Sequence, residues 1–383
     1  MALSVVQNKL VLIRNLAIFC MIGNLLYFMF PFPAIVWRLS FVLLCLYCVY
    51  ADYIRCGFSG VEKAILAFTG LNLIYFFVSY LWNNPSTTTL GNTLYALLAF
   101  VMFAFLGKKG ILTQKSILLS AILLTIAAIP SFYNAQQLAL TNIVNGGEET
   151  TVNMSTIFLM LLPLLFCVKK RIVSLIVFCV CLFFLISGAK RGNILAAVIP
   201  SVLYVWMLFK ENKKNVFKIS VLIIAVAVIA VWAKDMVLSD DYLLSRYEET
   251  LEGNTSGRDV IYFTMWNMWS GTDSIINFLF GYGYNGTFLY SPMHKFAHND
   301  WLEILVDFGL LGAVVYAAVF IAFARLYFRL DKGYLRLVCI AIASIWFMKT
   351  LYSMGFTDEM LALLAIPFGC LFSGYFNDRR IPE

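Results

Sequence analysis

The sequence contains few charged residues for its length. Of its 383 residues, 13% are Asp, Glu, Lys or Arg, whereas 62% are hydrophobic, and the mean hydropathy is +0.85. Soluble domains carry about 25% charged residues, so this composition excludes a soluble globular protein. The chain is therefore expected to be an integral membrane protein. Its net charge of +7 does not indicate nucleic-acid binding, because the basic residues follow the membrane topology.

Apolar stretches long enough to cross a bilayer recur along the chain. About 20 apolar residues in a helix span the roughly 30 Å of hydrocarbon, and a helix satisfies its own backbone groups there. The predicted fold class is an all-α polytopic membrane protein with about twelve transmembrane helices. The predicted spans are Arg14–Phe30, Ala34–Tyr50, Val61–Leu81, Leu90–Leu106, Ser116–Phe132, Val152–Val168, Ile172–Ser187, Ile194–Phe209, Phe217–Ala233, Trp301–Phe328, Tyr334–Ser353 and Glu359–Tyr375.

Basic residues indicate the orientation of these spans. Cytoplasmic loops retain Lys and Arg, and such residues gather at alternate ends, as in Lys169-Lys170-Arg171. Both termini are therefore expected to be cytoplasmic. No cleaved signal peptide is expected, because no small-residue cleavage site follows the first apolar run. The predicted organisation is nine spans in 1–233, one large periplasmic loop with short interfacial helices in 234–297, and three C-terminal spans in 298–383.

Cysteine is absent from the predicted outer loops. Eight of the nine cysteines lie in predicted spans, and Cys56 lies in a cytoplasmic loop. Structural disulfides are therefore not expected, and the cysteines are interpreted as small apolar core residues. Cys45 and Cys48 have the spacing of a redox or metal pair, but the same core interpretation is favoured for them.

Lys190 and Arg191 break the charge rule of the outer loops. Both lie in the turn Ser187-Gly-Ala-Lys-Arg-Gly-Asn193, which opens directly into a predicted helix. The first amide groups of a helix are unpaired and the helix dipole favours negative charge there, so this turn could bind an anion. The alternative is that both residues are snorkelling charges at a helix end.

Arg258 is the second basic exception on the outer side. It lies in Asn254-Thr-Ser-Gly-Arg-Asp259, which leads into a predicted interfacial helix over Val260–Trp269 that Ser256 could cap. A guanidinium group at a helix start suits phosphate oxygens. Pairing of Arg258 with Asp259 or with lipid headgroups would produce the same pattern.

The only two histidines, His294 and His298, lie where the outer segment returns to an apolar helix. Histidine exchanges protons near neutral pH, so His298 is interpreted as a general base. The two residues are four apart and could share a metal ion, but a metal site needs further ligands, so no metal is expected. Acidic residues follow at Asp300, Glu303 and Asp307, where carboxylates inside a span suggest function. Lys349 is expected to pair with Asp307, and a structural role for that pair is favoured over a catalytic one.

Together, three segments resemble the O-antigen ligase and polymerase superfamily of membrane glycosyltransferases. They are Ser187-Gly-Ala-Lys-Arg-Gly192, Gly257-Arg258-Asp259, and the run from His298-Asn-Asp to Gly309-Leu-Leu-Gly312. Each segment is weakly specific alone, but their order within 187–312 and their shared outer placement strengthen the resemblance. Lys190 departs from the usual pattern, which has a small or hydroxyl residue before the arginine, and this leaves the main phosphate ligand open between Lys190 and Arg191.

The resemblance implies transfer of a glycan from undecaprenyl pyrophosphate to an acceptor sugar hydroxyl at the periplasmic face of the bacterial inner membrane. No nucleotide sugar, metal or other cofactor is implied. Arg191 and Arg258 would stabilise the leaving diphosphate, and His298 would accept the proton of the acceptor. Further substrate-binding or orienting residues are expected at Lys190, Asn299, Asp300, Glu303 and Tyr284.

The acceptor separates two enzymes within this superfamily. A polymerase uses another lipid-linked repeat, whereas a ligase uses the lipid A core. Polymerase is favoured, because such enzymes occur in many divergent versions, although no residue distinguishes the two. Other polysaccharide-assembly proteins are further partners that the resemblance implies. A transporter or flippase is the alternative from another class, and it is disfavoured because transporters place polar sites near the bilayer midplane.

Overall fold

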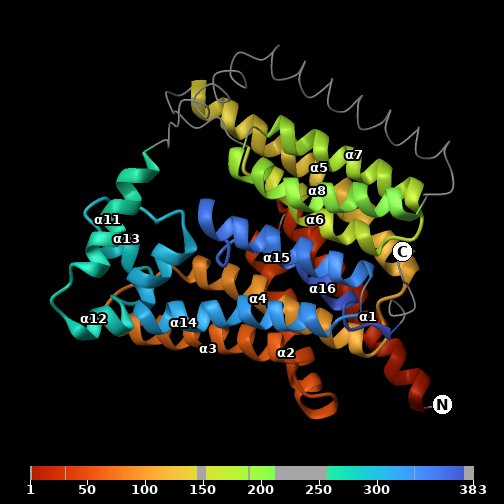
Figure 1. Cartoon of the computed structure of the whole chain (residues 1–383), viewed down its shortest axis with the longest axis horizontal. Coiled ribbons are helices and arrows are strands. Elements are labelled where there is room, and N and C mark those ends of the chain that lie inside the picture. Colours follow the sequence, from red (N-terminus) through yellow and green to blue (C-terminus); the bar gives the residue numbers. More distant parts are fainter. Residues whose placement is uncertain are drawn as a thin grey trace.

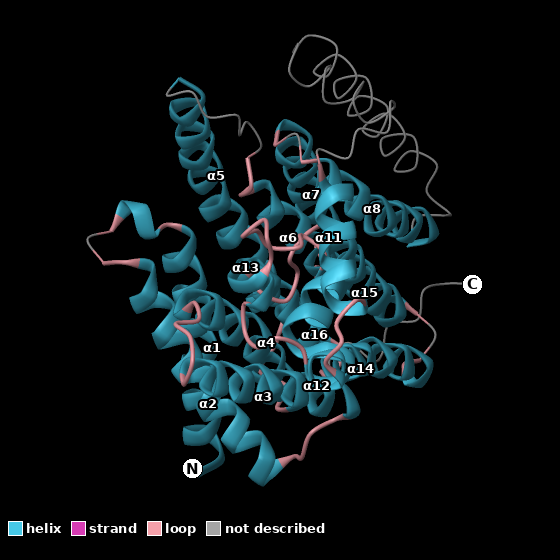
Figure 2. Ribbon diagram, turned by 90° about the vertical axis from the view of Figure 1, so that its left-hand side faces the viewer, coloured by secondary structure: helices cyan, strands magenta, loops and turns pink. Residues whose placement is uncertain are grey.

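The computed structural model of the chain is a bundle of helices (Figure 1). The structure describes residues 2–30, 32–144, 152–188, 190–211, 257–331 and 333–374. Every regular element in these ranges is a helix, which confirms the all-α class. Figure 2 views the bundle from the end at which the short helices α11, α12 and α13 lie.

Eight of the described helices are long and apolar enough to cross a membrane. Three shorter apolar helices occupy three further predicted spans, and the predicted span Phe217–Ala233 lies outside the described residues. The long helices are α1 (Ala2–Leu25), α2 (Ala34–Arg55), α3 (Gly60–Tyr80), α4 (Thr87–Lys108), α5 (Gln114–Val144), α8 (Arg191–Glu211), α14 (Asp300–Arg329) and α15 (Tyr334–Tyr352). The shorter ones are α6 (Ser155–Cys167), α7 (Arg171–Ser187) and the stretch Glu359–Cys370, which comprises η2 (Glu359–Leu364) and α16 (Ala365–Cys370).

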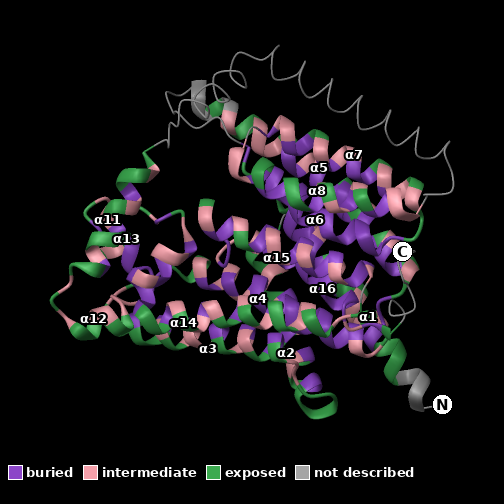
Figure 3. Ribbon diagram, in the orientation of Figure 1, coloured by how far each residue is buried: buried purple, intermediate pink, exposed green. Residues whose placement is uncertain are grey.

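Helix α6 forms part of the centre of the bundle. All 13 of its residues are buried. The outer helix α2, in contrast, leaves large apolar side chains exposed along its length, and α3 does so over its C-terminal part. Figure 3 shows this division between buried inner helices and exposed outer faces. Exposed apolar faces on helices of this length are what lipid contact requires, so the burial pattern agrees with a membrane protein.

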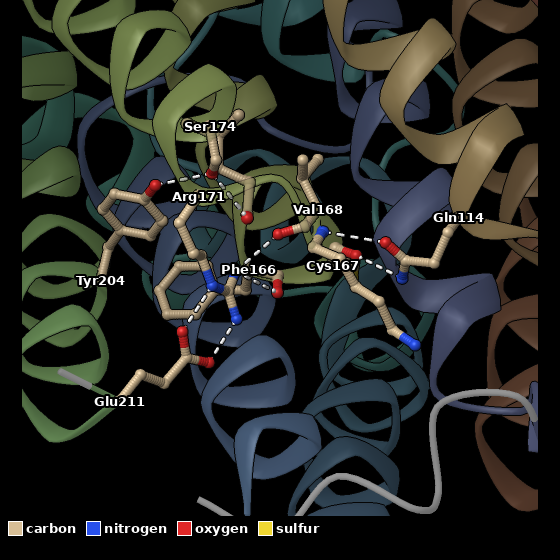
Figure 4. Close-up of polar contacts among 10 residues, drawn as sticks. Gln114, Phe166, Cys167, Val168, Arg171, Ser174, Tyr204 and Glu211 are labelled. Atoms are coloured by element: carbon tan, nitrogen blue, oxygen red, sulfur yellow. Dashed lines mark hydrogen bonds and ion pairs between the residues drawn. The ribbon is translucent and has the colours of Figure 1, made fainter.

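Polar contacts fix the turn between α6 and α7 (Figure 4). Arg171 forms a bidentate ion pair with Glu211 at the end of α8 and also donates to the carbonyl of Val168 at 2.6 Å. Gln114 accepts from the Lys169 amide and donates to the Cys167 carbonyl, both at 2.8 Å. Helix ends leave backbone groups unpaired, so these side chains complete the hydrogen bonding where α6 stops.

The short helices α11 (Arg258–Ser270), α12 (Ile275–Phe280) and α13 (Gly286–Tyr290) lie at one end of the bundle (Figure 1). The helix predicted over Val260–Trp269 is confirmed within α11. Its buried face contains Ile261, Met265 and Trp269, and the ring of Trp269 stacks on Phe278 of the α12 segment with centroids 4.7 Å apart. Apolar packing thus joins α11 to α12.

Helix α14 breaks at Gly309, which has φ 64°. The break frees backbone carbonyls one turn earlier, and the loop after α12 satisfies them: Tyr282 N donates to Val306 O at 2.8 Å and Gly283 N to Asp307 O at 3.0 Å. A Cβ atom at Gly309 would lie 2.5 Å from the backbone of Gly281. The glycine of the Gly-Leu-Leu-Gly motif therefore has a structural role, which is to let the outer segment dock on α14.

We expect Gly309→Ala to lower the free energy of unfolding by at least about 2 kcal/mol, because a left-handed non-glycine residue and an overpacked contact are both costly. The readout is the melting temperature of the protein in detergent, followed by tryptophan fluorescence. Gly70→Ala is the matched control: a Cβ there meets nothing within 4 Å, and alanine favours the helix by up to about 1 kcal/mol. Equal melting temperatures for the two variants would contradict the docking role of Gly309.

Candidate functional site

The C-terminal end of α15 provides two carbonyl acceptors to other elements. The last carbonyl groups of a helix have no partner within it and carry partial negative charge. Leu351 O accepts from Tyr262 and Asn299, and Tyr352 O accepts from Arg258. We call Leu351–Phe356 the α15 terminus. It joins the start of α11 to the start of α14.

Arg258 is the first residue of α11 and follows Gly257, which has the left-handed conformation with φ 74°. Its Nη1 atom donates to Tyr352 O at 2.9 Å, and its side chain is partly exposed. A guanidinium group has five N–H donors, so the bond to the Tyr352 carbonyl leaves donors for further partners. Ser256, predicted as a cap of this helix, lies outside the described residues.

Tyr262 lies one helical turn after Arg258. Its hydroxyl is 3.2 Å from His298 O and 3.2 Å from Leu351 O. Burial raises the pKa of the Tyr262 phenol above its ordinary value, so it remains a neutral donor at physiological pH. Tyr262 thus bridges the histidine segment and the α15 terminus.

His298 is exposed and has φ 52°, a left-handed conformation that is costly for a residue with a Cβ. Contacts on both sides hold it in this state. Before it, Ala297 N donates to Glu303 Oε2 at 2.7 Å. After it, the Asn299 side chain caps α14 by accepting from Trp301 N at 3.0 Å and Leu302 N at 3.2 Å. His294 also has positive φ, and its Nδ1 is 3.0 Å from Phe288 O.

Asp300 is fully buried beside the α15 terminus. It accepts from Gly355 N at 2.7 Å, Phe356 N at 3.3 Å and the Tyr316 hydroxyl at 2.6 Å. The sequence suggested Asp300 as a residue that binds substrate or orients the imidazole. In the structure, these contacts anchor the turn that follows α15.

Glu303 and Asp307 hold the outer loop against α14. Glu303 accepts a short hydrogen bond from the Thr287 hydroxyl, in addition to the bond from the Ala297 amide. Asp307 accepts from Asn285 N at 3.0 Å and Thr287 N at 2.9 Å. Both carboxylates are buried, so they act on backbone and hydroxyl groups of the protein.

The expected pairing of Lys349 with Asp307 is wrong. Lys349 is buried and its Nζ lies 2.9 Å from Asp358 Oδ2, with Ser353 Oγ at 3.4 Å. The reason is topological: the chain turns back immediately after α15, which brings a closer carboxylate to the ammonium group than α14 offers. The ion pair therefore closes the turn of the α15 terminus.

The turn that contains Lys190 and Arg191 packs against the same terminus. A Cβ atom at Gly192 would lie 3.2 Å from Tyr352 Cβ, so the turn and the α15 terminus are in close contact. Lys190 Nζ donates to Asn153 Oδ1 at 2.9 Å, and its charge acts on Asp358. Arg191 begins α8 and is partly exposed.

Tyr284 was expected to contact substrate. Its side chain is only 2% exposed, and its ring packs on Phe76 and Phe308 with centroids 5.5 Å and 6.0 Å away. In this conformation the ring is part of the packing between the outer loop, α3 and α14, and it presents no face for a sugar.

The three motif segments thus meet around one helix end. Two parts of this site were not predicted from the sequence: the hydroxyl of Tyr262 and the backbone of α15. The spacing of Arg258 and Tyr262 by four residues on one helix was the available signal, but nothing in the sequence identified the carbonyls that they reach. Among the described residues, no group of three or more His, Cys, Asp and Glu side chains is arranged to hold a metal ion.

The fold and this site define a polytopic helical membrane protein with a polar site at one end of its bundle. Residues 175–317 match the family model described as O-Antigen ligase. This match spans the three motifs and confirms the resemblance to the O-antigen ligase and polymerase superfamily. It implies a glycosyltransferase-like enzyme with lipid-linked sugar substrates. No curated protein matches the chain.

The Lys349–Asp358 pair leads to a prediction about acid stability. Burial alone would raise the pKa of Asp358. The Lys349 ammonium group, together with the charge of Lys190 and the Met360 amide, outweighs burial and lowers the pKa below its ordinary value. The folded pKa is thus below the unfolded one of about 3.9. The stabilisation is therefore complete above the unfolded pKa and is lost as the pH falls through the folded pKa.

We expect the melting temperature of the wild type to fall more steeply below about pH 4 than that of Asp358→Asn, because only the carboxylate has a proton to gain in this range. Asparagine retains an acceptor for the Met360 amide, which Asp358 caps at 2.9 Å. Asp273→Asn, at an exposed position, is the control and should follow the wild type. An equally steep fall in Asp358→Asn would contradict the role of the ion pair.

Proposed function

We propose that this protein transfers a glycan from undecaprenyl pyrophosphate to an acceptor sugar hydroxyl, as an O-antigen polymerase at the periplasmic face of the inner membrane. In this orientation both termini are cytoplasmic, residues 234–297 form the outer loop between 1–233 and 298–383, and the α15 terminus faces the periplasm. The match of residues 175–317 to the O-Antigen ligase family model supports this class of reaction.

The leaving group requires positive charge in this reaction. When the bond between the anomeric carbon and the diphosphate oxygen breaks, its electron pair stays on the diphosphate. Arg258 and Arg191 would stabilise that charge, with Lys190 as an additional cation near the same end of the bundle. Preorganised donors of this kind contribute about 10²–10³ in rate each.

The acceptor hydroxyl must lose its proton as its oxygen bonds to the anomeric carbon. His298 would take this proton as general base, a role worth about 10²–10⁴ in rate. Its side chain is exposed, whereas Asp300 and Glu303 are buried and engaged with backbone groups. We therefore assign Asn299, Asp300 and Glu303 to positioning the histidine segment.

One observation carries the proposal: the three motif segments share the α15 terminus. Arg258 donates to Tyr352 O, Gly192 packs on Tyr352, and the Tyr262 hydroxyl joins His298 O to Leu351 O. Segments separated by up to about a hundred residues therefore reach one helix end, as a site for a diphosphate and an incoming hydroxyl requires.

The identity of the acceptor can be tested by deleting the gene and analysing the lipopolysaccharide of the deletion strain on a gel. We expect lipid A core that bears a single repeat, because loss of a polymerase leaves transfer to the core intact. Uncapped core with accumulating lipid-linked polymer would instead identify a ligase, which is the second candidate. An unchanged ladder would contradict both.

Complementing that strain with Arg191→Ala, Arg258→Ala or His298→Ala should restore no polymer, since each substitution is expected to slow transfer by about 100-fold or more. The readouts are the gel and the amount of protein in the membrane, which should stay near normal. His294→Ala is the matched control for the imidazole, and Lys295→Ala, also exposed in the outer segment, controls for loss of a cation. Polymer in all three test variants would refute the catalytic assignment.

A further inference from the structure

Tyr262 makes an unusual pair of contacts in the candidate site. A phenol hydroxyl has one proton to donate, yet two backbone carbonyls lie 3.2 Å from it, those of His298 and Leu351. Its side chain is partly buried. The hydroxyl thus serves as a shared donor between two chain segments that are otherwise about 50 residues apart in sequence.

Both acceptors belong to backbone that needs external support. The His298 residue has φ 52°, and such a conformation costs about 1–3 kcal/mol unless neighbouring contacts maintain it. Leu351 O lies in the last turn of α15, where intrahelical donors are missing. The other donor to Leu351 O, Asn299 Nδ2, is at 3.3 Å. Tyr262 therefore provides the shorter of the two side-chain bonds to Leu351 O.

The same side chain also fixes the start of α11. Residues four apart on a helix lie on one face, so Arg258 and Tyr262 approach the α15 terminus together. Arg258 binds Tyr352 O while Tyr262 binds the adjacent Leu351 O. Loss of the tyrosine contact would leave the guanidinium attached to α15 by its own bond alone, although that group must also engage a substrate.

We propose that Tyr262 is a positioning residue that sets the separation of His298 and Arg258 through the carbonyls of His298 and Leu351. This inference rests on the proposed function, because its consequence is a rate of glycosyl transfer. A displacement of about 1 Å at a reacting group can cost about 10²-fold in rate. The tyrosine hydroxyl itself takes no part in bond making or bond breaking.

The test uses the full-length protein in detergent with a lipid-linked glycan donor. Tyr262→Phe keeps the ring and removes both hydrogen bonds, and we expect kcat to fall about 10–100-fold with an unchanged melting temperature. Tyr282→Phe is the matched control. The Tyr282 hydroxyl donates to Met268 O at 3.0 Å, and Met268 lies on α11, as Tyr262 does, but away from the α15 terminus. The rate of Tyr282→Phe should equal that of the wild type.

A double-mutant cycle with Arg258→Lys, which retains a cation, distinguishes positioning from general destabilisation. If Tyr262 acts through Arg258 and His298, the two substitutions share part of their effect. The fold-loss in kcat of the double variant should then be clearly smaller than the product of the two single fold-losses. Tyr282→Phe combined with Arg258→Lys should be multiplicative. Multiplicative losses for Tyr262→Phe would overturn the proposal.

A further variant covers the case in which Tyr262→Phe lowers the melting temperature. Ile261→Val weakens the buried face of the same helix, at a cost of about 0.5–1.5 kcal/mol, without touching either carbonyl. An equal loss of rate at an equal melting shift would overturn the positioning role. If Tyr262→Phe has wild-type activity while Arg258→Ala and His298→Ala are inactive, the positioning role is overturned and the proposed function still stands. If the alanine variants are active, the proposed function itself is refuted.

Discussion

The final carbonyl groups of α15 need hydrogen-bond donors, and this need organises the candidate site. A helix that ends in an apolar bundle cannot leave its last acceptors unpaired without a large free-energy cost. Three side chains from two other elements supply the donors here: Arg258, Tyr262 and Asn299. Because these donors belong to the motif-bearing segments, satisfying one helix end also assembles the site.

Buried carboxylates keep that assembly in place by binding backbone amides. Asp300 anchors the turn after α15, Asp307 anchors the loop at Asn285, and Glu303 anchors the residue before His298. Acidic residues within a span suggest catalysis when only the sequence is known. Here their partners are amides and hydroxyls of the protein, so they stabilise the irregular backbone that holds the exposed histidine.

Much of the fold was predictable, because hydropathy identifies membrane helices directly. The described helices occupy eleven of the predicted spans. Eight of these helices are long enough to cross a membrane, and three are shorter. Helix ends were less accurate. The prediction placed the end of the first span at Phe30, whereas α1 ends at Leu25 and a short 3-10 helix, η1 (Tyr27–Met29), follows it. The apolar character of the sequence continues past the end of the α-helix. The break at Gly309 was not predictable, since it depends on the close approach of residues 279–281.

The sequence alone determined the membrane class, the helical architecture and the three motifs that the O-Antigen ligase family model also spans. These follow from composition, periodicity and local residue order, which require no knowledge of distant contacts. Only the tertiary structure decided that Lys349 pairs with Asp358, that Tyr284 is buried and that Tyr262 bridges His298 to α15. The physical reason is that a hydrogen bond or ion pair forms with the nearest suitable group in space. The turn after α15 sets that distance for Lys349, and the packing of distant segments sets it for Tyr262.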